Sequence, residues 1–224
     1  MNYQKLFVIL FLGLFSFLQE PTVPSEFIDV SKIIPDLDIE LRYFSSHNFV
    51  GDTIDGYNSN RLYLTKAAAT QLKLVQDELQ MQNLCLRVYD GYRPQTAVNH
   101  FVRWARDLSD TIHKNEFYPL VDKRNLFSEG YIASKSGHSR GSTIDLTIVD
   151  GETNQPLDMG SPYDFFGEAS WVDYNKITKQ QKINRQLLQT VMIRHGFRNY
   201  PKEWWHFTLR GEPFPDTYFD FLVN

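Results

Sequence analysis

The sequence is poor in the features that mark several common protein classes. Its 224 residues include one cysteine, Cys85, which excludes an intrachain disulfide and any cysteine-rich zinc site. Positive charge is not in excess, because 23 Lys and Arg stand against 27 Asp and Glu, for a net charge of −4. No nucleic-acid partner is therefore expected. Hydrophobic residues make up 42% and charged residues 22%, an ordinary balance for one globular domain.

Long hydrophobic runs are also scarce. The apolar run from Leu6 to Leu18 has 13 residues, fewer than the roughly 20 that a membrane-spanning helix needs. It follows Lys5, a pattern typical of a secretory signal peptide. We expect residues 1–18 to be a signal peptide, 19–26 a polar linker and 27–224 a single domain exported to the periplasm. The cleavage site is poor, so an uncleaved N-terminal anchor is the alternative; no stable membrane span is expected.

Hydrophobic periodicity predicts an α+β fold. Some segments alternate apolar and polar residues, as strands do, and others repeat apolar residues at helical spacing. Several connections between them are too short for crossovers, which favours a mainly antiparallel central sheet flanked by helices. The predicted strands are 36–44, 84–89, 143–149 and 204–209, and the predicted helices are 65–80, 94–108 and 178–195. Residues 45–60 and 150–173 are expected to be loops, and 110–130 an insertion. Gly196 is expected to end the last helix.

Two short stretches contain residues suited to metal chemistry. Residues 136–145 read SGHSRGSTID and residues 203–206 read EWWH. Together they offer His138, Asp145 and His206, and two imidazoles with one carboxylate form a reasonable catalytic zinc set that leaves one position for water. Asp145 occupies the polar face of its predicted strand, so its carboxylate can point away from the core.

Glu203 lies three residues before His206, which places the two on opposite faces of a straight strand. We therefore expect Glu203 in the turn before the strand, near the metal without binding it. A general base that acts on metal-bound water belongs in this position.

Arg93 lies in the stretch DGYRP, residues 90–94, between a predicted strand and a predicted helix. Next to a zinc ion it can stabilise an oxyanion. A structural arginine paired with Asp90 is an equally good interpretation of the residues alone. The remaining histidines, which have no such context, are expected to be surface or structural residues: His47, His100, His113 and His195. Trp204 and Trp205 are expected in the core and pocket wall.

These motifs, in this order, resemble the zinc D-alanyl-D-alanine dipeptidase family, the VanX-like group of the D,D-peptidase clan. The patterns S-x-H-S-R-G-S-x-x-D-L-T, E-W-W-H-F and D-G-Y-R-P are all present. The resemblance extends through residues 41–43, 48–49 and 158–166, and so spans roughly residues 39–209. The S-R-G-S run and the Asp164 segment favour the dipeptidase branch.

The resemblance implies a zinc D,D-peptidase/hedgehog-like fold and one zinc ion per subunit, held by His138, Asp145 and His206. It implies that Glu203 moves the proton from the zinc-bound water to the leaving amine, and that Arg93 stabilises the oxyanion. Substrate contacts are implied for three more residues: Ser136, Asp164 and Tyr43. Asp164 would pair with the free ammonium of a small D,D-dipeptide, D-alanyl-D-alanine. Other divalent ions can suit such a site.

Two rival functions remain open from the sequence. One is a D,D- or L,D-carboxypeptidase or endopeptidase acting on peptidoglycan stems, which would need an open cleft. The other is a non-catalytic wall-binding module, which the presence of both Glu203 and Arg93 argues against. The export signal suits salvage of wall-derived dipeptide better than glycopeptide resistance.

Overall fold

The computed structural model describes residues 22–224, and the predicted signal peptide, residues 1–18, lies outside them. A five-stranded sheet has the order β2-β4-β5-β7-β6. Its β2–β4 pair is parallel and its other pairs are antiparallel, so the predicted α+β fold is confirmed. The strands of this sheet are β2 (Asp38–Ile39), β4 (Leu84–Asp90), β5 (Thr143–Asp150), β6 (Phe197–Tyr200) and β7 (Glu203–Leu209). A separate antiparallel pair joins β1 (Phe27–Asp29) and β3 (Tyr63–Thr65).

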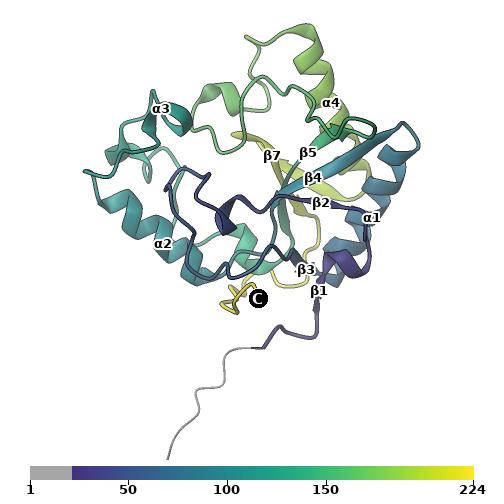
Figure 1. Ribbon diagram of the computed structural model, residues 1–224, viewed down its shortest axis with the longest axis horizontal. Helices are drawn as coiled ribbons and strands as arrows, with labels where there is room; N and C mark the ends of the chain where they lie inside the picture. Colours follow the sequence, from purple (N-terminus) through teal and green to yellow (C-terminus); the bar gives the residue numbers. More distant parts are fainter. Residues whose placement is uncertain (1–21) are drawn as a thin grey trace, which may run out of the picture.

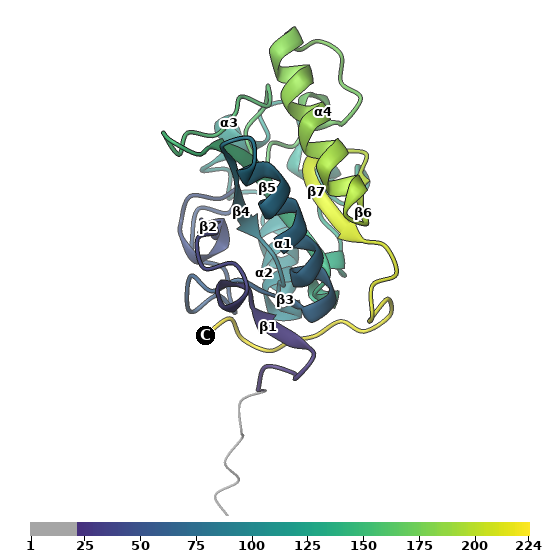
Figure 2. The same cartoon turned by 90° about the vertical axis from the view of Figure 1, so that its right-hand side faces the viewer.

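Helices cover both faces of the sheet. They are α1 (Lys66–Gln80), α2 (Gln95–Arg106), the short α3 (Lys114–Phe117) and α4 (Lys179–Arg194). Helices α1 and α4 pack on one face, and α2 lies on the other (Figures 1 and 2). Within residues 22–224, no helix is both long and apolar enough to cross a bilayer.

The helix ends follow their local chemistry. The side chain of Thr65 accepts a hydrogen bond from Ala68 N at the start of α1. Thr178 and Gln181 form a capping box at the start of α4. Gly196 follows α4 with φ +85°, which a residue without Cβ adopts at little cost. All three ends agree with the prediction to within a residue or two.

Other boundaries differ from the prediction. The predicted strand 36–44 is wrong beyond Ile39: the chain leaves the sheet and forms a 3₁₀ turn, Arg42–Phe44. Leu41 and Tyr43 are buried there without strand pairing, so alternate burial alone produced the strand-like pattern. Pro94 precedes the first turn of α2 instead of occupying it. Strands β1, β3 and β6 are not among the predicted elements.

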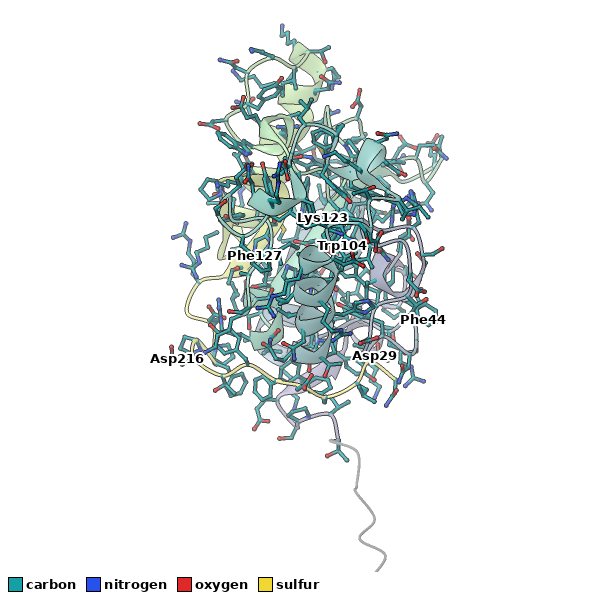
Figure 3. The ribbon with its side chains drawn as sticks, turned by 90° about the vertical axis from the view of Figure 1, so that its left-hand side faces the viewer. Asp29, Phe44, Trp104, Lys123, Phe127 and Asp216 are labelled. Atoms are coloured by element: carbon teal, nitrogen blue, oxygen red, sulfur yellow. The ribbon has the colours of Figure 1, made fainter. Side chains whose placement is uncertain are left out.

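The predicted insertion packs closely on α2. Lys123 is 5% exposed and places its ammonium 4.0 Å from the ring centre of Trp104 in α2. The two side chains lie together in Figure 3. Tyr118 contacts the same indole edge-on, with ring centres 5.5 Å apart. The insertion is thus anchored, and its last residue, Gly130, and the residues directly after it border the cavity that holds the candidate site.

The C-terminal segment, residues 212–224, crosses the bottom of the molecule and ends near β1 and β3 (Figure 2). Phe219 N donates to Ser139 O at 2.9 Å, which joins the segment to the turn after which β5 begins. Asp220 accepts from Thr96 N at 2.6 Å and so caps the first turn of α2. Phe221 stacks on Tyr92 with ring centres 3.9 Å apart. The segment therefore ties α2 to the rest of the domain.

Candidate active site and metal centre

The sheet register brings two predicted metal ligands together. Asp145 on β5 pairs directly with His206 on β7, so their side chains emerge on the same face. The neighbours Ile144 and Leu146 point to the opposite face and are fully buried. The strand alternation predicted from the sequence is thus confirmed for Asp145.

His138 comes from a tight turn just before β5. The turn is a 3₁₀ helix, Gly137–Arg140, and the side chain of Ser136 accepts a hydrogen bond from His138 N at its start. It ends at Gly141, which has φ +80°. A Cβ on Gly141 would lie 2.2 Å from Phe27 Cε1, so both the conformation and the packing require glycine here.

The three side chains meet at the distances that a tetrahedral metal site requires. His138 Nε2 lies 3.3 Å from His206 Nδ1 and 3.3 Å from Asp145 Oδ2, and Asp145 Oδ1 lies 3.1 Å from His206 Nδ1. Metal–ligand bonds of about 2.0–2.1 Å in tetrahedral geometry separate the ligand atoms by about 3.3 Å. Among residues 22–224, this is the one group of three or more such side chains that meets closely enough to hold an ion.

The surrounding hydrogen bonds also fit a metal. His138 Nδ1 faces Gly91 O at 2.8 Å, so it donates there and leaves Nε2 as the ligand atom. Asp145 Oδ1 is buried and has no hydrogen-bond partner in the described chain, although His206 Nδ1 is near. Asp145 Oδ1 and His206 Nδ1 therefore face each other across a position that a cation can share, either a proton or a metal ion. Burial lowers the pKa of His206, but the carboxylates of Asp145 and Glu203 outweigh it and raise the pKa to about 9.

Glu203 reaches the same side of the sheet as His206, although the sequence analysis placed it in the turn before the strand. It is the first residue of β7, directly after the β6–β7 turn. The register of β6 and β7 shifts at this end, where Tyr200 pairs with Glu203 although continuation of the ladder would pair it with His206. This irregularity breaks the alternation. The half-buried carboxylate therefore lies 3.2 Å from His206 Nδ1 and lines the cavity.

Arg93 is paired with Asp90, as one of the two interpretations from the sequence expects, and it also lies near the candidate metal ligands, where the other interpretation places it. Its guanidinium donates to the fully buried Asp90, with Nε and Nη2 at 2.8 and 2.7 Å from Oδ2. Nη2 also lies 3.6 Å from Asp145 Oδ2, and the guanidinium stacks over Tyr43 at 4.9 Å. Asp90 thus holds a cation at the edge of the cavity, close to the metal ligands.

The remaining predicted residues line one cavity of about 300 Å³, at the small end for ligand sites. Asp164 accepts a hydrogen bond from Tyr43 O–H at 2.9 Å. Burial and the negative charge of Asp145 raise the pKa of Asp164 well above its ordinary value. Ser136 borders the cavity at the turn that bears His138. All eight predicted site residues therefore border one space.

Several contributors were missed by the sequence analysis. Asp90 was considered only as a structural partner, yet it also lies 3.4 Å from His138 Nδ1. The Gly91 carbonyl, which faces His138 Nδ1, could not be identified from the sequence, because every residue has a backbone carbonyl. Tyr163 contacts Asp145 and was not singled out, although it directly precedes Asp164.

Other predicted residues lie elsewhere. The four remaining histidines do not join the metal group; His195 Nε2, for example, lies 2.8 Å from Glu78. Trp204 and Trp205 are buried, as predicted, but neither lines the catalytic cavity.

Residues 24–224 match the Peptidase M15 family model, described as D-ala-D-ala dipeptidase. A D-alanyl-D-alanine dipeptidase of Enterococcus faecalis is 42% identical over 83% of this chain and 92% of its own length. The namesake of Enterococcus faecium is 40% identical over 88% and 98%, and that of Escherichia coli is 35% identical over 83% and 85%. A solved zinc-bound D,D-pentapeptidase, a VanY mutant, aligns with a TM-score of 0.42 and 16% identity over 68% of this chain and 76% of that chain, too distantly to support an argument. The family model and these relatives cover most of the domain, and the chain therefore belongs to the D-alanyl-D-alanine dipeptidase family.

Proposed function

We propose that this protein is a zinc-dependent dipeptidase that hydrolyses D-alanyl-D-alanine to two molecules of D-alanine. The observation that carries the proposal is the arrangement of the cavity. The ligand set His138, Asp145 and His206, the base Glu203 and the cation Arg93 border one space of about 300 Å³, which Asp164 also lines. Zinc, when bound, polarises the scissile carbonyl and lowers the pKa of water toward 7.

The residues of the chain divide the remaining work. Glu203 is half-buried and has no cation partner in the described chain other than His206, so its carboxylate can take the proton of the attacking water and return it to the leaving amine. Arg93 is fixed by Asp90 and presents its guanidinium toward Asp145, where it stabilises the negative charge that develops on the carbonyl oxygen.

The small cavity and Asp164 support a dipeptide substrate. Asp164 is 6% exposed, and burial raises its pKa because the ionised carboxylate has lost its hydrating water. A cation that pairs with the carboxylate replaces this lost hydration and stabilises its ionised form. A free ammonium on the substrate is such a cation, and an acylated peptide nitrogen is not. Cleavage is therefore restricted to substrates whose amino group lies next to the scissile bond.

The first test uses zinc-loaded protein lacking residues 1–18. D-Alanine release is followed from D-alanyl-D-alanine and from a stem pentapeptide ending in D-Ala-D-Ala, with Glu203→Ala as the inactive control. Cleavage of the dipeptide alone, lost in the variant, supports the proposal. Cleavage of the pentapeptide assigns the protein to the carboxypeptidase branch. Zinc binding without cleavage of either supports the wall-binding module.

Asp164 separates the two enzymatic functions most directly. Replacement of Asp164 by Ala should cripple dipeptide cleavage selectively, because the substrate ammonium loses its carboxylate. Equal losses on a dipeptide and on an N-acylated peptide would show that Asp164 does not recognise the amino group.

We further propose that the protein is exported to the periplasm, where it salvages D-alanyl-D-alanine released from the wall. The apolar run of residues 6–18 after Lys5 supports export. N-terminal sequencing of protein from a periplasmic fraction tests it, and an intact Met1 would favour the anchored alternative. Salvage predicts little change in glycopeptide susceptibility on expression, and a clear gain in resistance would contradict it.

A further inference from the structure

Tyr163 is a buried tyrosine whose ring is already held by packing. It lies in the loop between β5 and α4, directly before Asp164, and is 5% exposed. Its ring stacks on Tyr89 with centres 4.6 Å apart and meets Trp205 edge-on at 5.4 Å. A phenylalanine would make the same ring contacts. The hydroxyl therefore needs a separate explanation, because burying a hydroxyl costs free energy unless it is hydrogen-bonded.

The hydroxyl of Tyr163 has two partners, and both belong to the active site. It lies 3.2 Å from Asp145 Oδ2 and 3.2 Å from the hydroxyl oxygen of Tyr43. The Tyr43 hydroxyl in turn donates to Asp164 Oδ2 at 2.9 Å. Four buried groups thus form one chain of hydrogen bonds, from the carboxylate proposed to bind the substrate ammonium to a metal ligand.

We propose that Tyr163 is a positioning residue that fixes the metal ligand Asp145 and joins it to the Tyr43–Asp164 pair. Asp145 Oδ2 lies 3.3 Å from His138 Nε2, so the rotation of this carboxylate decides how it meets the ion. A hydrogen bond to a ligating carboxylate restricts that rotation. The connection to Tyr43 and Asp164 rests on the proposed function; the action on Asp145 does not.

The number of hydroxyl protons fixes the directions of these hydrogen bonds. Tyr43 uses its one proton toward Asp164, so its oxygen can only accept from Tyr163. Tyr163 also has one proton, and it must share this proton between Tyr43 and Asp145. Removing the Tyr43 hydroxyl leaves Asp145 as the only acceptor for Tyr163. Removing the Tyr163 hydroxyl deprives both.

The test measures zinc affinity by competition with a chromophoric chelator, so it needs no substrate. Loss of an outer hydrogen bond to a metal ligand typically weakens metal affinity or activity about 10–100-fold, and we expect a loss in this range for Tyr163→Phe. Tyr89→Phe is the matched control: it removes a hydroxyl from the ring stacked on Tyr163, outside the catalytic cavity. It should leave zinc affinity within about twofold of the wild type.

Two further measurements separate positioning from simple packing. The visible spectrum of the cobalt-substituted protein reports the ligand field, and Tyr163→Phe should change it while Tyr89→Phe does not. Tyr43→Phe should keep zinc affinity and raise the KM for D-alanyl-D-alanine. This variant also tests the proposal if Tyr163→Phe fails to fold.

Three results would overturn the proposal. They are wild-type zinc affinity in Tyr163→Phe, an equal loss in Tyr89→Phe, and a loss of zinc affinity in Tyr43→Phe. If the wild type binds zinc but leaves D-alanyl-D-alanine intact, the proposed function fails. The effect of Tyr163 on zinc affinity still stands or falls by the chelator titration.

Discussion

Arg185 provides the sharpest test of how the loop bearing Asp164 is held. It lies on α4, is 3% exposed, and its guanidinium donates to three backbone carbonyls of the loop between β5 and α4. The acceptors are Met159 O at 2.6 Å, Trp171 O at 2.8 Å and Ala169 O at 2.7 Å. One side chain thus fixes both ends of the segment that contains Asp164. We predict that Arg185→Met destabilises the domain and weakens substrate binding.

The magnitude follows from these contacts. Hydrogen bonds to a charged group each contribute about 1.5–3 kcal/mol, so three bonds contribute at least about 4.5 kcal/mol. The cost of burying the charge offsets part of this sum, and the same burial lowers the pKa of Arg185 to about 10. Methionine fills much of the volume but leaves the carbonyls without donors. The expected loss in the free energy of unfolding is about 3 kcal/mol.

The assay is equilibrium urea unfolding of the zinc-loaded protein, combined with steady-state kinetics. Lys182→Met is the matched control, because Lys182 is an exposed cation on the same helix. It should change the free energy of unfolding by less than about 0.5 kcal/mol. In Arg185→Met, the KM for D-alanyl-D-alanine should rise more than kcat falls. Equal stabilities of the two variants would refute the reasoning.

Three further predictions concern the metal site and its turn. Glu203→Gln should lower kcat by about 10²–10⁴-fold with unchanged zinc content, and loss of zinc in metal analysis would contradict its role as base. Zinc must displace the proton of His206, whose pKa is raised to about 9 when no metal is bound. The apparent zinc affinity in chelator titrations should therefore rise about tenfold per pH unit from pH 6.5 to 9. A zinc affinity that does not change with pH over this range would contradict the prediction. Gly141→Ala should lower the free energy of unfolding in urea by about 2 kcal/mol or more, because φ is +80° and the new Cβ meets Phe27. Gly211→Ala is the control: φ is +64° but the space is open, so the loss should be about 1 kcal/mol. Equal losses in the two variants would show that the contact with Phe27 does not matter.

Sequence patterns predicted the parts of the fold whose cause is local. Thr65, Thr178 and Gly196 mark helix ends through hydrogen bonds or backbone conformation within one turn. Asp145 could be assigned to the polar face because alternation along β5 is regular. The three candidate metal ligands could also be named, because two imidazoles and a carboxylate suit zinc and the motifs around them resemble those of the zinc dipeptidases.

Features that depend on distant contacts were not predictable in the same way. Strand β3 has three fully or nearly fully buried residues and no alternation, since its pairing with β1 is a tertiary contact. The register shift at Tyr200 decides where Glu203 points, and its effect appears only when β6 and β7 are paired. Tyr163 resembles any core aromatic residue until the fold brings it to Asp145.

The path of the C-terminal segment affects how the protein is made. Asp220 caps α2 and Phe219 joins the turn of the metal ligand His138, so these contacts form only after residues 212–224 have left the ribosome. Until then, α2 lacks its cap from Asp220, and the turn that carries His138 lacks its hydrogen bond to Phe219. A chain truncated before residue 219 would therefore lack the cap on α2 and the hydrogen bond to the turn that carries His138, although all three metal ligands would be present.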